Sequence, residues 1–99
     1  MITVDQSQPS ILKVPNVFTP DGNQLNDFFE IYTENIALLE GIIVNRWGQT
    51  MLEFNSIDFT WDGMFEDKEA SEGTYFIKYR AIDFNENILE GHTFFNLIR

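Results

Sequence analysis

Four oxygen-bearing side chains fall within a seven-residue stretch of the sequence. Asp21, Asn23, Asn26 and Asp27 offer carboxylate and amide oxygens, which are the ligands that calcium prefers in proteins. The full pattern of an EF-hand loop, with its distal glutamate, is absent. Asp and Asn also hydrogen-bond their own backbone in tight turns, and only two of the four are carboxylates. We therefore expect a turn and no cofactor here, with a calcium site as the less favoured alternative.

The remaining polar residues do not form a catalytic pattern. His92 is the single histidine and the chain has no cysteine, whereas nucleophilic catalysis needs a base that is oriented by a third group. No GxSxG, HExxH or phosphate-loop motif occurs. Sixteen carboxylates will place some pair at a glycosidase-like spacing by chance, so their number carries no argument. The chain is predicted not to be an enzyme.

Composition restricts the class of partner. The chain has 99 residues, of which 43% are hydrophobic, enough for one domain with a real core. The net charge of −10 argues against nucleic acid and anionic membrane surfaces, because both attract basic patches. No apolar run approaches the ~18 residues of a membrane-spanning helix, so no membrane insertion is expected. No signal peptide is recognisable, so export would depend on a longer parent chain or on the domain itself. We expect a monomer.

Short strands separated by turns must position these residues. Alternating and β-branched segments predict about seven strands, over residues 11–14, 16–18, 28–32, 41–48, 49–54, 74–84 and 88–99. Residues 33–40 are ambiguous between a short helical turn and a connection, and residues 64–73 are interpreted as an acidic loop. This spacing is typical of an all-β, immunoglobulin-like antiparallel β-sandwich. Residues 1–10 are interpreted as a linker remnant or a loose first strand, and residues 11–99 as the domain.

One predicted hairpin and one predicted strand have specific geometry. Gly48 and Gln49, between two strand-like segments, suggest a tight two-residue connection. In residues 74–84, the side chains of Tyr75, Ile77, Tyr79 and Ala81 should share one face of the strand, because side chains alternate along a strand. Lys78 and Arg80 should then lie on the opposite face.

Five ordered blocks of sequence resemble one protein family. VPNVFTPDGNQLNDFF, VNRWGQ, WDG, EGTYFIKY and a final LIR occur in this order. With them the chain resembles the gliding motility-associated C-terminal domain, the type B sorting domain of the type IX secretion system, over residues 11–99. The opening FTPNGDGxND pattern of that family is matched by Phe18, Thr19, Pro20, Gly22, Asn26 and Asp27. Asp21, Asn23 and Gln24 depart from it, and in EDKEAS only Lys68 remains of the usual NGK-x-L-P.

The resemblance implies a non-catalytic C-terminal secretion signal. Such a domain carries a large N-terminal passenger of the same parent chain across the periplasm and through the type IX system, to the cell surface or the medium. It implies binding to secretion-system components, including an outer-membrane partner protein. The alternative is an adhesive β-sandwich module of a surface protein, either stabilised by calcium or binding carbohydrate. The two Trp and three Tyr of the chain motivate the carbohydrate form.

The matched blocks also supply candidate site residues. The candidates for partner binding are Arg46, Trp47, Asp62, Lys78, Arg80 and Arg99. The predicted signature turns involve Pro20, Asp21, Gly22, Asn26, Asp27, Gly48, Gly63 and Gly73.

Each candidate allows a structural role beside the functional one. Trp47 and Trp61 are expected to be core or sheet-covering aromatics, because indoles bury large areas. Arg46 can stack on Trp47 or pair with a carboxylate such as Asp62. Arg99 is expected to be exposed by its position, either as a handle for a receptor that adds to the strand or as a frayed end.

Overall fold

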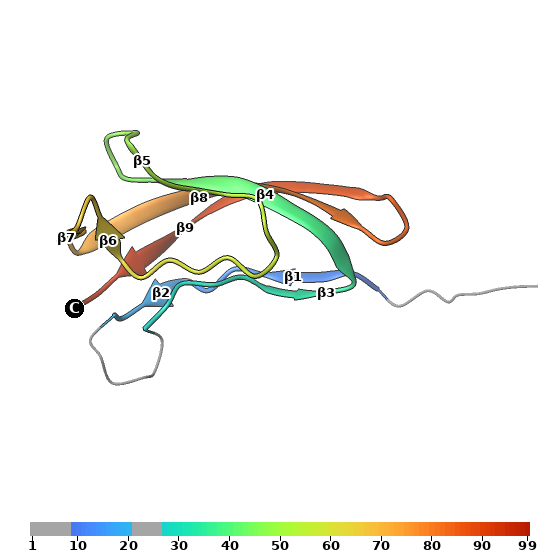
Figure 1. Ribbon diagram of the computed structural model, residues 1–99, viewed down its shortest axis with the longest axis horizontal. Helices are drawn as coiled ribbons and strands as arrows, with labels where there is room; N and C mark the ends of the chain where they lie inside the picture. Colours follow the sequence, from blue (N-terminus) through green and yellow to red (C-terminus); the bar gives the residue numbers. More distant parts are fainter. Residues whose placement is uncertain (1–8, 21–26) are drawn as a thin grey trace, which may run out of the picture.

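The computed structural model describes residues 9–20 and 27–99. The strands of these ranges are β1 (Ile11–Lys13), β2 (Val17–Phe18), β3 (Tyr32–Glu34), β4 (Ile36–Val44), β5 (Thr50–Phe54), β6 (Met64–Phe65), β7 (Lys68–Glu69), β8 (Gly73–Asp83) and β9 (Ile88–Leu97) (Figure 1). The described residues contain no helix that could cross a membrane. The all-β prediction is confirmed.

The main sheet contains five strands in the order β2-β9-β8-β4-β5. Its long central strand β8 pairs antiparallel with both β4 and β9. The two-residue β2, in contrast, runs parallel to β9, so the pairing is not antiparallel throughout as predicted. No tight hairpin constrains this pair, because β2 and β9 lie far apart in the chain, and a distant strand can be added in either direction.

A second layer faces the main sheet. In it β1 and β3 pair antiparallel and lie across the core from β4, β8 and β9 (Figure 1). Beside them Phe29 and Trp61 form an isolated bridge, in which each backbone N–H donates to the other's carbonyl at 2.8 and 3.0 Å. The predicted strand over residues 28–32 is therefore reduced to this bridge, and β3 begins at Tyr32. The two layers form an immunoglobulin-like sandwich.

Aromatic side chains fill the space between the layers. Phe29 stacks on Phe95 with ring centroids 4.0 Å apart, and Trp61 lies edge-on to Phe95 at 6.2 Å. All three are almost fully buried, as is Phe18, which contacts Trp61. Each such burial contributes roughly 1.5–3 kcal/mol. Since the chain has no disulfide, these contacts hold the two layers together.

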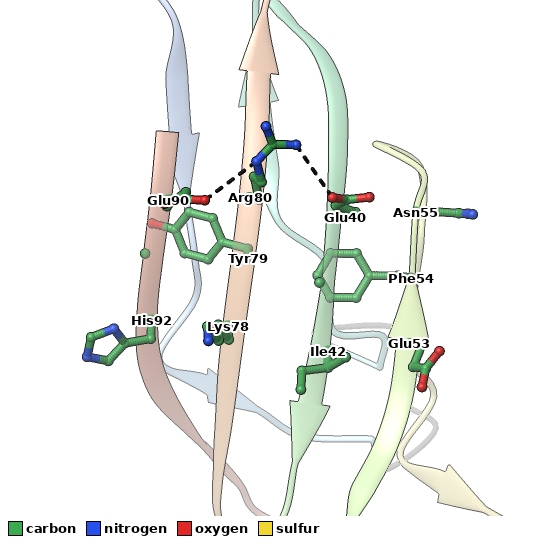
Figure 2. Close-up of a pocket in the computed structure, with 12 residues that line it drawn as sticks. Glu40, Ile42, Glu53, Phe54, Asn55, Lys78, Tyr79, Arg80, Glu90 and His92 are labelled. Atoms are coloured by element: carbon green, nitrogen blue, oxygen red, sulfur yellow. Dashed lines mark ion pairs between the residues drawn. The ribbon is translucent and has the colours of Figure 1, made fainter. Parts of the chain in front are cut away.

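Two glycines of the main sheet lie beneath aromatic rings. Gly91 of β9 is opposite Tyr79, and Gly41 of β4 is opposite both Tyr79 and Phe54. A Cβ atom at Gly91 would lie 2.5 Å from the Tyr79 hydroxyl oxygen, and one at Gly41 would lie 2.7 Å from Cζ of Phe54. The rings of Tyr79 and Phe54 therefore cover the backbone of the neighbouring strands, as Figure 2 shows for both rings.

Two connections differ from the predicted ones. Residues 33–40 form no helical turn, and the alternative of a connection is also wrong for most of them, because β4 begins at Ile36 and the strand predicted over residues 41–48 lies at 36–44. Asn35, at φ 61°, is the single residue between β3 and β4. The predicted acidic loop contains the small β6–β7 hairpin, whose turn residues Glu66 and Asp67 have φ of 51° and 67°. Left-handed backbone at both positions suits a two-residue hairpin, but neither residue is the Gly or Asn that signals such a turn.

Candidate functional site: the β4–β5 loop and the outer face of the main sheet

The loop between β4 and β5, residues 45–49, is closed by the side chain of Asn45. Its Oδ1 accepts hydrogen bonds from the backbone N–H groups of Trp47, at 3.0 Å, and Gln49, at 2.9 Å. The backbone N–H of Gly48 donates to the Asn45 carbonyl at 3.0 Å, and Gly48 has φ 86°. The predicted two-residue hairpin is therefore wrong, because Asn45 organises a longer loop. Hydrogen bonds to Asn45 thus hold the backbone of Trp47, Gly48 and Gln49 in place.

This loop presents Trp47 to solvent. The Trp47 side chain is 75% exposed, whereas Trp61 is 3% exposed. The prediction of a core or sheet-covering aromatic is thus confirmed for Trp61 and wrong for Trp47. The physical reason is that β4 ends at Val44 and the loop rises on the side of the sheet away from β1 and β3 (Figure 1). No second layer covers it there.

Arg46 stacks on its neighbour. Its Cζ atom lies 4.5 Å from the Trp47 ring centroid, within the range of a cation–π contact. Of the two roles predicted for Arg46, the structure shows the stack. Asp62 instead accepts a hydrogen bond from the backbone N–H of Met64 at 3.0 Å, at the start of β6. Asp62 and Arg46 are therefore not joined as a pair.

Strand register places an apolar row beside this loop. On β8 the predicted alternation is confirmed, with Tyr75, Ile77 and Ala81 buried. Phe76 therefore lies on the opposite, outer face, where it stands between Val44 of β4 and Phe94 of β9. Phe76 is 43% and Phe94 52% exposed. We call Val44, Arg46, Trp47, Phe76 and Phe94 the Trp47 corner.

Charged residues occupy the middle of the outer face. Arg80 lies between its register partners Glu40 and Glu90, at 3.7 and 3.5 Å from their carboxylate oxygens (Figure 2). Both pairs are solvent-exposed, so each contributes about 0–1 kcal/mol. Lys78 lies between Ile42 and His92 in the next row, and it forms no ion pair with the residues that the structure describes. These rows line an open depression of about 910 Å³.

Apart from the two Arg80 ion pairs, the described polar side chains around this depression are separate from one another. His92 stands opposite Lys78, and no base–nucleophile arrangement surrounds it among residues 9–20 and 27–99. Across the same residues, no group of three or more His, Cys, Asp or Glu side chains could hold a metal ion. The chemistry that the face offers is an exposed aromatic surface with cationic groups at its border.

Comparison with known families agrees with the ordered sequence blocks. The model of the CHU_C type IX secretion signal domain matches residues 12–95. The chain belongs to this family. The resemblance predicted from the sequence is thereby confirmed, and membership implies export to the cell surface or the extracellular space. No curated protein matches the chain.

In this type IX secretion signal domain, three of the sequence blocks converge at Gly63. A Cβ atom at Gly63 would lie 3.2 Å from Cγ of Pro20, 3.3 Å from Nη2 of Arg99 and 3.4 Å from the Phe18 ring. Gly63 also has φ 81°, a conformation that favours glycine. The FTP, WDG and LIR blocks therefore meet at one packed junction. Their first role is to build the fold.

Arg99 takes part in this junction through its guanidinium group. Nη2 donates to the carbonyls of Gly63, at 2.9 Å, and Ala70, at 3.0 Å, while Nε donates to Ala70 at 3.1 Å. Nη1 lies 3.6 Å from the Glu69 carboxylate, and the side chain is only 20% exposed. Arg99 lies at an exposed position, as expected, but its side chain is not frayed, because the residues around the β6–β7 hairpin supply it with acceptors. Its role as a handle for a receptor stays a prediction.

Other candidate positions have simpler settings. Gly48 and Gly73 have φ of 86° and 145°, which suits the turns expected there. Asp21, Gly22, Asn23 and Asn26 lie outside the described residues, so the turn and calcium predictions remain predictions.

Burial raises the pKa of Tyr75, and the positive charges of Arg99 and Arg46 act in the opposite direction.

Proposed function

We propose that this domain is a non-catalytic sorting signal that secretion machinery recognises in its folded state. Membership of the type IX secretion signal family supports the proposal. In it, the domain binds components of the system, including an outer-membrane partner protein, while its N-terminal passenger is moved to the cell surface or the medium. The domain itself performs no reaction and needs no cofactor.

The observation that supports recognition of the folded surface is the exposure of Trp47 on a loop that is held by hydrogen bonds. Trp and Arg are the residues most enriched among those that dominate the energy of protein interfaces. Here Arg46 and Trp47 are already stacked, and Asn45 fixes the backbone beneath them. A preorganised contact of this kind loses little conformational entropy on binding.

A secretion assay tests the proposal. Residues 1–99 are fused to an inert periplasmic reporter in a host that has a type IX system, and the reporter in the medium or on the cell surface is measured. We expect export of the fusion. For Trp47→Ala, truncation of an interface aromatic costs about 2 kcal/mol, so partner affinity should fall about 30-fold and export should drop.

The matched control is Phe84→Ala. Phe84 is 70% exposed but follows β8 at the opposite end of the sheet from the β4–β5 loop (Figure 1), so export should be retained. Melting temperatures confirm that each variant is folded. A folded wild-type domain whose reporter stays in the periplasm contradicts the proposal.

The carbohydrate-binding alternative keeps one supporting residue. Trp61 is buried, so only Trp47 offers an exposed indole to a sugar ring. Chemical-shift titration with soluble glycans addresses this alternative directly, since a bound sugar would shift the Trp47 indole resonance.

A further inference from the structure

We infer that the partner contacts the Trp47 corner through a segment that combines carboxylates with apolar side chains. The inference rests on the proposed function, because it specifies the chemistry of the partner at the same surface. It follows from an exposed apolar row and from Arg46 and Lys78 beside it, which form no ion pair with the residues that the structure describes.

The apolar row is continuous across three strands. Val44, Phe76 and Phe94 are direct register partners, and facing side chains on adjacent strands lie about 5 Å apart. Trp47 follows Val44 by three residues and is the most exposed of the large apolar side chains in the described ranges. Contiguous apolar surface of this kind on a soluble domain marks an interaction site. The partner must therefore bring apolar side chains.

The charges beside this row favour an acidic partner. The chain has only six basic residues, and three of them lie on this face or at its end: Arg46, Lys78 and Arg80. Arg80 is engaged by Glu40 and Glu90. Arg46 and Lys78, in contrast, form no ion pair within the part of the chain that the structure describes, and they approach the row from two sides.

Local charge outweighs the net charge at such short range. The domain carries −10 overall, but exposed charges beyond about 8 Å are largely screened at physiological ionic strength. On the edge strand β5 the nearest register row carries one carboxylate, Glu53, which lies opposite Ile42. A partner carboxylate placed over the row meets Arg46 and Lys78, while a partner lysine there would face two like charges. A second copy of the chain is disfavoured for the same local reason, because a symmetric pair would bring a further Arg46 and Lys78 to the same surface.

Charge reversal tests the acidic character of the partner. In the reporter fusion, the double variant Arg46→Glu with Lys78→Glu places two acids beside the apolar row. We expect export to fall about tenfold or more, because like charges across an interface are strongly unfavourable. The matched control is Lys13→Glu with Lys68→Glu, which changes the net charge equally on β1 and β7, away from this face. It should export like the wild type.

A second pair of variants tests the apolar row. Phe94→Ser removes an exposed ring of the Trp47 corner, and Ile88→Ser removes a 57% exposed side chain at the other end of β9. Export should fall for Phe94→Ser and persist for Ile88→Ser. Melting temperatures identify any variant that does not fold. If the charge-reversed double variant does not fold, the neutral pair Arg46→Gln with Lys78→Gln replaces it. Export of this neutral pair should also fall below that of its control, but by less than the tenfold expected for charge reversal.

The outcomes separate the inference from the proposed function. If the wild-type fusion is not exported, the proposed function fails. If it is exported and the two double variants behave alike, whether both active or both inactive, the local-charge inference is overturned. If sedimentation shows that the wild type self-associates and Phe94→Ser does not, the face binds a second copy, which also overturns the inference.

Discussion

Single side chains with short polar groups determine the shapes of two loops in this domain. Asn45 does so between β4 and β5, and Asp83 does so between β8 and β9. Asp83 Oδ1 accepts hydrogen bonds at 2.8 Å from the backbone N–H groups of Asn85 and Asn87, and its Oδ2 accepts one at 3.1 Å from the Asn87 side chain. Glu86 in the same turn has φ 67°, so the turn depends on these bonds.

The Asp83 turn predicts a pH dependence of stability. Hydrogen bonds from Asn87, first from its backbone N–H, lower the pKa of Asp83 although burial acts in the opposite direction. A lowered folded-state pKa means that the stabilisation is present above the unfolded value of about 3.9 and is lost as the pH falls through the folded value. Urea midpoints of the wild type should therefore decline below about pH 4 more steeply than those of Asp83→Ala.

The control for this measurement is Asp58→Ala, at an exposed position. Its midpoints should follow the pH dependence of the wild type. Identical slopes for the wild type and Asp83→Ala would show that this carboxylate contributes nothing to the acid sensitivity of the domain.

Among the elements, the β6–β7 hairpin depends most on its surroundings. Its strands have two residues each, and hairpins of this size have little stability alone. The backbone N–H of Ala70 donates to Gly63 at 2.8 Å, and the Arg99 guanidinium bridges the carbonyls of the same two residues. The planar, multi-donor shape of Arg suits this bridge better than a Lys ammonium would.

Removal of the Arg99 bridge should loosen this hairpin. We expect Arg99→Ala to cost about 1.5–3 kcal/mol, the range for hydrogen bonds to a charged group, and Arg99→Lys to recover part of it. Denaturant midpoints measure the cost, and faster amide exchange at Ala70 locates it. The matched control is Arg80→Ala, which loses only two exposed ion pairs and should cost less, because each such pair contributes about 0–1 kcal/mol. Equal costs for the two variants would contradict the bridging role.

The whole molecule is a sandwich that is held by aromatic burial without disulfides. Among the described residues no second layer covers its outer sheet face, so one fold provides both a packed core and an exposed face, which we propose as the recognition surface. The sequence blocks of the family divide between these tasks. The blocks around Gly63 and Arg99 build the junction, whereas the NRWG block places Arg46 and Trp47 at the surface.

The effect of calcium on stability is a prediction about the whole domain. We propose that the domain folds without calcium, because only two of the four candidate ligands near Asp21 are carboxylates. Millimolar calcium should then leave the melting temperature unchanged. A bound metal at 100 times its dissociation constant would stabilise the native state by about 2.7 kcal/mol, a rise of about 10–20 °C for a domain of this size. Such a rise would support the calcium-stabilised adhesive alternative.

The sequence by itself determined the features that depend on neighbouring residues. The alternation in β8 predicted which of its side chains are buried, because strand periodicity is local. Gly48, Gly63 and Gly73 marked positions of positive φ for the same reason, and the ordered blocks identified the family.

Only the tertiary structure decided the features that depend on distant contacts. Trp47 has the size of a core residue, and its exposure follows from where the second layer ends. Arg99 was expected at an exposed end, but its acceptors lie 29 and 36 residues away at Ala70 and Gly63. The parallel pairing of β2 with β9 likewise joins opposite parts of the chain. No local pattern encodes such contacts, because they form only when the two layers pack.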